Sequence, residues 1–542
     1  QYLLRSDDGG MSWREISPDL TRNDKSKQGT SGGPVSKDNA SAEYYDLIYA
    51  IAPSPLASGQ IWVGTDDGLI QLTRDGGKSW ANVTPKGLPE WAKVSMIEAS
   101  HFDAGTAYAA VDAHKLDDFN PYIFITHDYG KSWSRENAGF SAPAFLRAVR
   151  EDPKEKNLLY AATETGVYVS FDQGKRWQTL ELNLPVTSVR DLVVKNGDLV
   201  AATHGRGFWI LDDISPLREI AAGANAESDR LYAPREAIRL HSMAGGGLPY
   251  ESVGENPPDG AILYYSLAGK TKGAVTLTVS DAAGTVLKTF STEPKPVEND
   301  HPLEFPSEEH EKPEKLDAKP GLNRAVWDLR HEKAPEIEGA YYDMGGPVSP
   351  MVLPGRYTVT LTVDGKTSSQ PLTVVKDPRT QVTEAALEQQ YELMVKLDQA
   401  IRQDHEAANA IIAARASLES LHKRLAADQS NAALVKLADE AKTLDQKLSD
   451  VLEDFYQYHA QAEEAELNYP TKLNSQLAYL EELVDSADSA PTAQEVQAYA
   501  LLRTELDAAL ARWQEAQAGI AAFNAKLAQA GVGPVPAGSR KK

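Results

Sequence analysis

The octet THDYGKSW, residues 126–133, sets an aspartate beside a histidine, a hydroxyl and an indole, as a catalytic site would. Three near copies occur elsewhere: SDDGGMSW at 6–13, TRDGGKSW at 73–80 and SFDQGKRW at 170–177. Four copies of one active site in one chain would be unusual, whereas self-similarity at intervals is the mark of a repeat architecture. The octet therefore decides the fold and is not evidence of catalysis.

The spacing of the copies indicates the type of repeat. Their third residues, Asp8, Asp75, Asp128 and Asp172, are 67, 53 and 44 residues apart, which is typical of propeller blades. Copies follow strand-like pairs such as QIWVGTDDGLIQL at 60–72, and DLVAATHGRGFWILDD at 198–213 is a degenerate fifth pair. Residues 1–216 are thus predicted to form four blades and part of another.

Each residue type that recurs among the four octets has a local structural role. The aspartate can accept backbone N–H bonds across a hairpin, the glycine at the fifth place tolerates positive φ, and the tryptophan buries a large face. The pattern S/T-x-D-x-G-x-S/T-W resembles the Asp-box, or BNR repeat, although Arg176 replaces the hydroxyl in the fourth copy. That resemblance implies a peripheral, structural role for the four aspartates, and His127 occupies the variable second place.

A longer resemblance covers nearly the whole chain. IWVGTDDGLI at 61–70, ATHGRGFWILDDISPL at 202–217, PGLNRAVWDLR at 320–330 and YPTKLNSQLAYL at 469–480 resemble bacterial sortilin-like proteins. The common label of these proteins, glycosyl hydrolase, derives from the Asp-box, which is not a catalytic motif. The resemblance therefore implies a fold and leaves activity open.

Two further domains are expected after a linker at 217–254. Hairpin patterns in AVTLTVSDAAGTVLKTFS at 274–291 and RYTVTLTVDGKTSSQPLTVV at 356–375 predict an immunoglobulin-like β-sandwich over 255–377. It resembles the module of flagellar hook-capping proteins. A charged loop at 291–320 contains His301 and His310, but a solvated loop explains them, and we predict no metal site.

The apolar period becomes helical from Thr383 onward. Four stripes predict an antiparallel bundle over 378–531, one of whose stripes could instead be a homodimer seam, followed by a disordered tail at 532–542. The first helix is expected to be about forty residues long. The stripes begin at Leu387, Leu444, Leu473 and Leu502.

Composition excludes several classes of function. The 542 residues include 55 basic and 78 acidic side chains, and the net charge of -23 opposes binding to nucleic acid. The chain contains no cysteine, so thiol chemistry is excluded, and no apolar run is long enough to span a membrane. We predict no cofactor.

The first residues carry an expectation about partners. Because QYLLRS resembles a late strand of a blade, we expect a separate N-terminal propeller chain or fragment to complete the ring. A signal peptide lost upstream would give a periplasmic or extracellular location.

Candidate ligand-binding residues lie where the propeller's channel face is expected. Several arginines there could bind a carboxylate or phosphate, or could instead join blades through salt bridges to Glu151, Asp152 and Asp191. The candidates are Glu98, Arg147, Arg150, Arg190, Asp191, His204 and Arg206.

Two classes of function remain. The first is a non-catalytic scaffold that recognises a peptide, protein or glycan. The second is a glycoside hydrolase, which needs two carboxylates roughly 5–9.5 Å apart. Spacing singles out no pair among its candidates, which are Asp46, Asp66, Asp67, Glu98 and Asp191. The binding scaffold is our prediction, with the hydrolase as the alternative.

Overall fold

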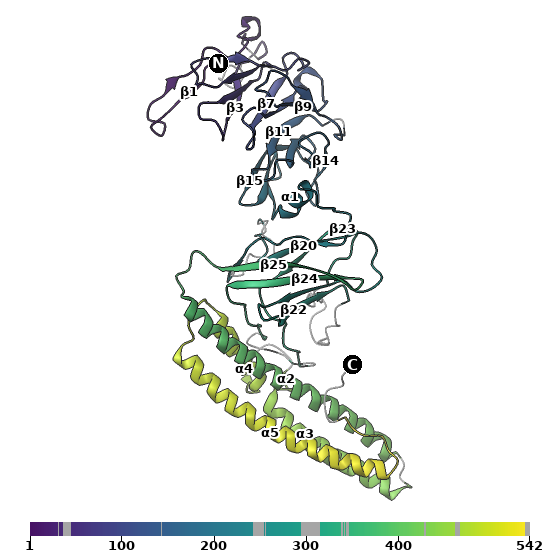
Figure 1. Cartoon of the computed structure of the whole chain (residues 1–542). Helices are drawn as coiled ribbons and strands as arrows, with labels where there is room; N and C mark the ends of the chain where they lie inside the picture. Colours follow the sequence, from purple (N-terminus) through teal and green to yellow (C-terminus); the bar gives the residue numbers. More distant parts are fainter. Residues whose placement is uncertain are drawn as a thin grey trace. The chain divides into compact units, whose positions relative to one another are not determined.

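The computed structural model describes residues 1–536 except 31, 36–44, 142–143, 242–253, 255, 294–314, 338–339, 341, 343–345, 428–429 and 461–466. His301 and His310 therefore lie outside the described residues. The chain divides into two compact units, Gln1–Ala226 and Glu227–Lys542. The second unit contains both the expected sandwich and the helices, although the sequence pattern predicts two separate domains there (Figure 1).

The first unit is a succession of small antiparallel sheets. Each octet lies between the last two strands of its sheet, and consecutive strands are always neighbours. The sheets are a ribbon of β1 (Leu4–Arg5) and β2 (Arg14–Glu15); β3 (Ile48–Pro53), β4 (Ile61–Thr65), β5 (Ile70–Thr73) and β6 (Ala81–Asn82); β7 (Lys93–Ala99), β8 (Ala107–Asp112), β9 (Tyr122–Thr126) and β10 (Ser134–Arg135); β11 (Leu146–Glu151), β12 (Leu159–Thr163), β13 (Val167–Ser170) and β14 (Gln178–Thr179); and β15 (Val189–Lys195), β16 (Asp198–Thr203) and β17 (Phe208–Leu211).

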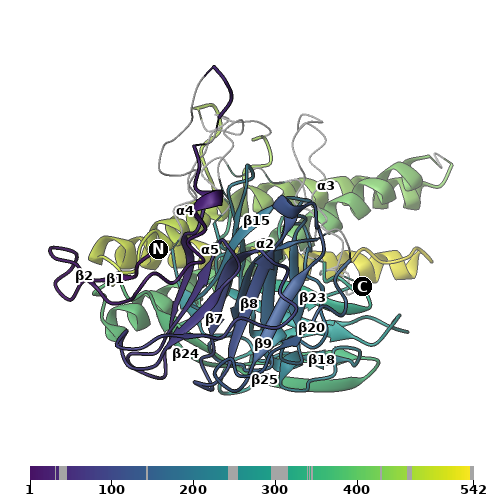
Figure 2. The same ribbon diagram turned by 90° about the horizontal axis from the view of Figure 1, so that it is seen from above.

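Successive sheets pack face to face because their residues alternate between two apolar faces. In β8, Ala109 lies in the core shared with the preceding sheet, which also contains Trp62, whereas Ala110 lies in the core shared with the following sheet, which also contains Ala161. Figure 2 shows neighbouring strands β7, β8 and β9 of one such sheet. The first unit is thus a propeller-like array, as the octet spacing predicts.

The first unit extends beyond the expected boundary at 216. Helix α1 (Ser215–Ala221) buries Leu217 and Ala221 in the core of the last two sheets, and Arg218 pairs with buried Asp152 at 3.0 Å. Residues 217–221 are therefore part of this unit and not a linker. Their apolar residues are too few for the sequence to distinguish a short packed helix from a linker.

Two sheets of the second unit share one apolar core. The predicted hairpins at 274–291 and 356–375 are present, and β19 (Ala237–Arg239), which lies within the expected linker, pairs parallel with β25 (Lys366–Lys376). Immunoglobulin-like connectivity stays a prediction. The sheets are β18 (Arg230–Leu231), β20 (Ala261–Leu267) and β23 (Gly321–Trp327), and β19 (Ala237–Arg239), β25 (Lys366–Lys376), β24 (Gly355–Val363), β21 (Thr276–Ser280) and β22 (Val286–Ser291).

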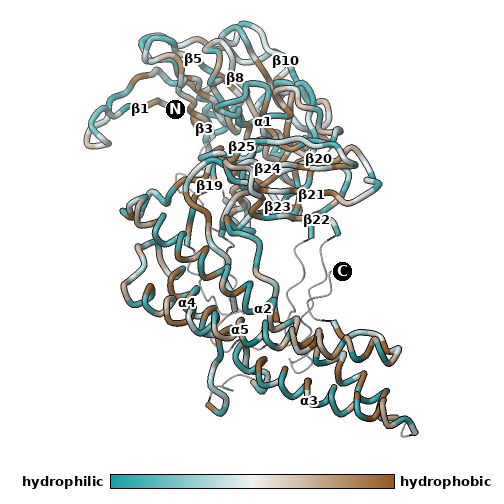
Figure 3. Tube along the Cα trace, turned by 60° about the horizontal axis from the view of Figure 1, so that its bottom comes forward, coloured by the Kyte–Doolittle hydropathy of each residue, from teal (hydrophilic) through white to brown (hydrophobic). Residues whose placement is uncertain are grey.

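Within the described residues, the predicted helical region is confirmed as four helices, of which α2 (Glu384–Ala426) has 43 residues. Thr383 and Thr492 cap α2 and α5, and apolar and polar residues alternate along the helices in Figure 3. α3 runs antiparallel to the two long helices, α2 and α5. Residues further along α2 or α5 form their hydrogen bonds to residues that lie earlier in α3. The helices are α2 (Glu384–Ala426), α3 (Ala432–Phe455), α4 (Leu473–Asp485) and α5 (Ala493–Gln529).

The start of the expected disordered tail is ordered. Val535 is buried in the helical core, and its backbone N–H and C=O each bond to the side-chain amide of Asn524 at 2.8 Å. The composition of 532–542 gives no sign of this bidentate contact. Residues 537–542 lie outside the described part of the chain.

Candidate functional site

Each octet aspartate closes its own hairpin. Asp128 accepts from Ser132 N at 2.8 Å, from Ser132 Oγ at 2.7 Å and from Thr126 Oγ1 at 3.0 Å. The hydroxyl of Ser132 is the main cause that lowers the pKa of Asp128. Equivalent bonds form around Asp8, Asp75 and Asp172, and in the fourth copy Arg176 donates from its backbone N at 2.9 Å. These carboxylates are occupied by local hydrogen bonds.

The octet tryptophans connect neighbouring sheets. Trp133 donates from Nε1 to Val83 O at 2.8 Å, and Trp80 donates to Ile16 O at 3.0 Å, so each indole reaches the segment that follows the preceding sheet. Trp177 is buried. Trp13 of the first octet differs, because it is 62% exposed and donates only to Gly10 O of its own hairpin.

Arg150 connects three successive sheets. It lies on β11, and its Nη1 donates to Glu98 Oε2 on β7 at 2.9 Å, while its Nη2 donates to Asp191 Oδ1 on β15 at 3.0 Å. Its Nε donates to Leu192 O at 2.7 Å. Burial raises the pKa of Glu98, and the positive charge of Arg150 opposes that shift. Three of the predicted site residues thus meet, but they satisfy one another.

Arg147 forms a second network at the start of β11. Its Nη1 donates to buried Asp112 at 2.8 Å, and its Nη2 and Nε donate to Glu164 Oε2 at 2.7 and 3.0 Å. Ser188 donates to the same Glu164 oxygen at 2.8 Å. Asp112 and Glu164 are not identified as site residues by the sequence. The only sequence feature that could have identified them is their position at the ends of the strands β8 and β12.

Two of the three carboxylates that were expected to pair with the predicted arginines have other partners in the structure. Glu151 accepts from the hydroxyl of Tyr108 at 2.9 Å and from the backbone N of His101 at 2.6 Å, and it raises the pKa of the His101 imidazole. Asp152 pairs with Arg218 of α1. Among the three carboxylates proposed as blade-joining partners, only Asp191 contacts a predicted arginine.

Three predicted residues remain exposed at one end of the β15–β17 sheet. Arg190 is the second residue of β15, and His204 and Arg206 lie in the turn between β16 and β17. The turn is fixed because Arg206 N donates to Thr203 Oγ1 at 3.1 Å and His204 N donates to Ser188 O at 2.8 Å. Within the described part of the chain, neither Arg190 nor Arg206 has an ion-pair partner within 4.0 Å. We name these three residues the basic rim.

Three of the five carboxylates considered for hydrolysis, Asp46, Asp66 and Asp67, lie close together, whereas Glu98 and Asp191 are held by Arg150. Asp46 and Asp67 are completely buried, Asp46 accepts from Gln28 Nε2 at 2.7 Å, and burial is the main cause that raises the pKa of Asp67 to about 6. Asp67 also accepts from Thr65 Oγ1, and Asp66 accepts from Leu47 N at 2.6 Å. Asp46 and Asp67 are buried and hydrogen-bonded within the protein, whereas a glycosidase pair flanks a bound sugar.

Other kinds of site can be assessed over the described residues. No group of three or more histidine and carboxylate side chains there could hold a metal ion. None of the helices in that part of the chain is long and apolar enough to cross a membrane.

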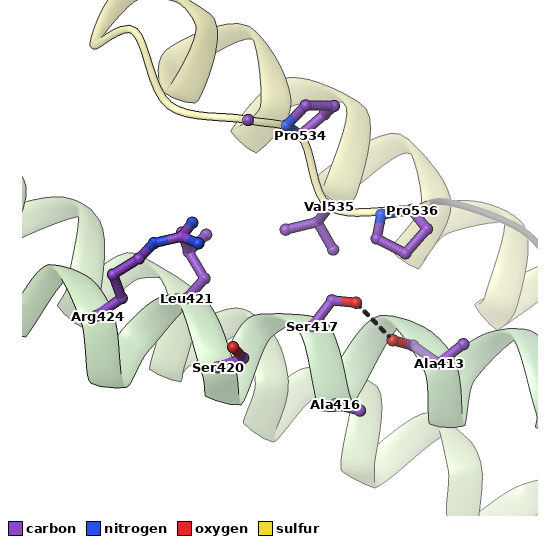
Figure 4. A pocket seen from close by; sticks show the side chains of 10 residues that line it. Ala413, Ala416, Ser417, Ser420, Leu421, Arg424, Pro534, Val535 and Pro536 are labelled. Atoms are coloured by element: carbon purple, nitrogen blue, oxygen red, sulfur yellow. Dashed lines mark hydrogen bonds between the residues drawn. The ribbon is translucent and has the colours of Figure 1, made fainter.

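A cavity of about 420 Å³ lies between α2 and residues 533–536, with Arg424, Ser417 and Pro534 among its lining residues (Figure 4).

No protein-family model and no curated protein matches the sequence. Three similar solved structures are YCF48 bound to D1 peptide, YCF48 from Cyanidioschyzon merolae and the GH74 xyloglucanase from Xanthomonas campestris, each with a TM-score of 0.25. Their sequence identities are 16%, 19% and 12%, over 41%, 30% and 30% of this chain. The alignments span 63%, 53% and 29% of those chains, less than two thirds of each.

Proposed function

We propose that the first unit is a non-catalytic binding module that recognises carboxylate groups on a peptide or protein through the basic rim. The observation that carries this proposal is the difference between the arginines. Arg147 and Arg150 are neutralised by carboxylates of neighbouring sheets, whereas Arg190 on β15 and Arg206 in the turn between β16 and β17 are exposed. Exposed guanidinium groups pair with carboxylates in a bidentate geometry.

The surroundings of the rim favour such a ligand. The chain carries a net charge of -23, so a local group of cations is a distinct feature of its surface. Arg190 is close enough to Glu164 to help lower the pKa of that carboxyl, which already has Arg147 and Ser188 as partners. Because Glu164 is already bonded to Arg147, it does not fully neutralise the positive charge of the basic rim.

A binding assay with defined probes tests this function. Immobilised oligoglutamate should capture the chain, oligoglutamine of equal length should not, and added salt should weaken the capture. Replacing both Arg190 and Arg206 by Gln should weaken capture by roughly two- to thirtyfold, because each exposed ion pair that is lost is worth roughly 0.2–1 kcal/mol. Equal capture of oligoglutamine would contradict the proposal.

A matched control and an activity assay complete the design. Lys154 and Lys156 are exposed cations in the loop between β11 and β12, so replacing both by Gln removes the same charge elsewhere in the unit. That variant should keep full capture. A panel of aryl glycosides should give no turnover; turnover that is lost on replacing one carboxylate would favour the hydrolase.

A further inference from the structure

In β3, β7, β11 and β15, the first strands of four successive sheets, one residue near the start of the strand has no cross-strand partner. The register with the second strand of the sheet shifts there by one residue, which is a β-bulge. The bulge residues are Tyr49, Ser95, Arg147 and Arg190. Arg147 and Arg190 therefore occupy the same place in two successive sheets, and the contacts of one can be compared with those of the other.

A second place in the repeat lies across from each bulge, on the residue that follows the last paired residue of the second strand. Its backbone contact is the same in successive sheets, since Glu164 N donates to Phe145 O at 3.3 Å and His204 N donates to Ser188 O at 2.8 Å. We call this place the strand-end position. Its residues are Asp66, Asp112, Glu164 and His204. The strand-end position thus holds a carboxylate in three sheets and a histidine in the fourth.

In the third of these sheets, the bulge arginine bonds to two strand-end carboxylates. Arg147 Nε and Nη2 donate to Glu164 Oε2 of the same sheet at 3.0 and 2.7 Å. Its Nη1 donates to Asp112 of the preceding sheet at 2.8 Å. The carboxylate of its own sheet therefore occupies the Nε–Nη2 edge of the guanidinium, and the carboxylate of the preceding sheet lies at Nη1.

In the fourth sheet, the same arrangement lacks one carboxylate. Arg190 contributes to the lowered pKa of Glu164, so it lies near the strand-end carboxylate of the preceding sheet, as Arg147 does. At the strand-end position of its own sheet, however, stands His204, which has no negative charge with which to neutralise a guanidinium. Over the residues that the structure describes, no carboxylate lies within 4.0 Å of Arg190.

We propose that His204 leaves Arg190 available to the ligand, whose carboxylate takes at Arg190 the place that Glu164 takes at Arg147. This inference rests on the proposed function, because it specifies how the basic rim holds its carboxylate ligand. The ligand carboxylate accepts from Nε and Nη2 of Arg190, along one edge of the guanidinium. His204 is then a positioning residue, and a glutamate at position 204 would occupy that edge from within the chain.

Capture on immobilised oligoglutamate tests the role of His204 in ligand binding. His204→Glu should weaken capture at least as much as Arg190→Gln, which should weaken it by up to about fivefold, because the new carboxylate competes with the ligand for Arg190. His204→Gln differs from His204→Glu only in charge and should capture more strongly than His204→Glu. His127→Glu is the control, since it makes the same substitution at an octet residue that bonds to Thr106. That control should keep full capture.

The outcomes separate this inference from the proposed function. If the wild type captures oligoglutamate and His204→Glu captures it equally well, the inference is wrong and the proposed function stands. If the wild type does not capture oligoglutamate, the proposed function fails and the inference fails with it. An equal loss of capture in His127→Glu would show an effect of net charge alone and would also overturn the inference.

A double-mutant cycle tests the contact without any ligand. Denaturant midpoints of His204→Glu and His204→Gln are compared twice, once with Arg190 present and once in the Arg190→Gln background. His204→Glu should have the higher midpoint only when Arg190 is present, because the new ion pair needs both charges. Equal midpoints in the presence of Arg190 would show that a carboxylate at position 204 does not reach the guanidinium, and would overturn the inference.

Discussion

Arg150 and Glu98 lie on neighbouring sheets 52 residues apart in the chain, and their side chains meet at 2.9 Å. Because the second arm of the guanidinium bonds to Asp191 on the next sheet, one side chain connects three sheets. A ligand would have to displace both carboxylates to use this arginine. The pair therefore acts as a structural connection, and its removal should affect stability first.

We predict that Arg150→Gln lowers the unfolding free energy of the first unit by roughly 2–3 kcal/mol. The loss of one partner of a largely buried pair leaves the Glu98 carboxylate uncompensated, and the partial exposure of Arg150 reduces the cost below that of a fully buried pair. Denaturant titration measures the change. Arg176→Gln is the control, since Arg176 is exposed and its contact with Asp172 is 3.3 Å. Equal effects of the two substitutions would contradict the prediction.

Local sequence predicts the sheets better than it predicts these connections. The octet specifies a hairpin because Asp128 bonds to residues two and four positions away, so eight residues contain the whole pattern. Glu98, Arg150 and Asp191 could be placed in one region from the repeat, but their mutual bonding depends on how sheets pack. The buried position of Val535 likewise depends on Asn524 and on α2, which its Pro- and Gly-rich neighbours do not indicate.

We predict that Asp128→Ala lowers the melting temperature of the first unit and leaves oligoglutamate capture unchanged. Three hydrogen bonds of one hairpin are lost, and none involves the basic rim. The folded-state pKa of Asp128 lies below 3.8, so this stabilisation is complete above that pH and is lost as the pH falls through the folded-state value. The melting curves of the variant and the wild type should therefore converge in acid.

The neighbouring histidine provides a control for that experiment. His127 Nδ1 lies 2.9 Å from Thr106 Oγ1, outside the hairpin bonds of Asp128. His127→Ala should change the melting temperature less than Asp128→Ala. If Asp128→Ala instead abolished capture at an unchanged melting temperature, the octet would be part of a binding site.

A buried arginine connects the sandwich to the helices within the second unit. Arg239 of β19 pairs with Asp488, and its Nε donates to Val352 O at 3.0 Å. We predict that Arg239→Met costs roughly 3–5 kcal/mol, because Asp488 then loses its guanidinium partner in a poorly hydrated site and keeps only the His241 imidazole, whose Nε2 lies 2.9 Å away. Adding Asp488→Leu should recover part of this loss, since two apolar groups leave no uncompensated charge. Arg324→Met, at an exposed position of β23, is the control, and calorimetry measures all three.

Glu481 of α4 should make the second unit less stable as the pH rises. It is buried, its Oε2 accepts from Val348 N at 2.9 Å, and its Oε1 has no partner among the described residues. Burial raises its pKa from 4.5 to about 8. The protonated form is therefore favoured in the folded state, so its stabilisation is complete below pH 4.5 and declines as the pH rises through about 8.

We predict that Glu481→Gln removes this dependence and stabilises the unit at pH 7 by roughly 2–4 kcal/mol relative to the wild type. Burial also lowers the pKa of His405 to about 4, which makes acid destabilising below pH 6.5, but that contribution is common to both proteins and cancels in their difference. Glu482→Gln, on the next and exposed residue, should leave the curve unchanged. Unfolding free energies of the three proteins between pH 5 and 9 measure the effect. A difference between Glu481→Gln and the wild type that stays constant over that range would show that Glu481 is ionised in the folded protein throughout.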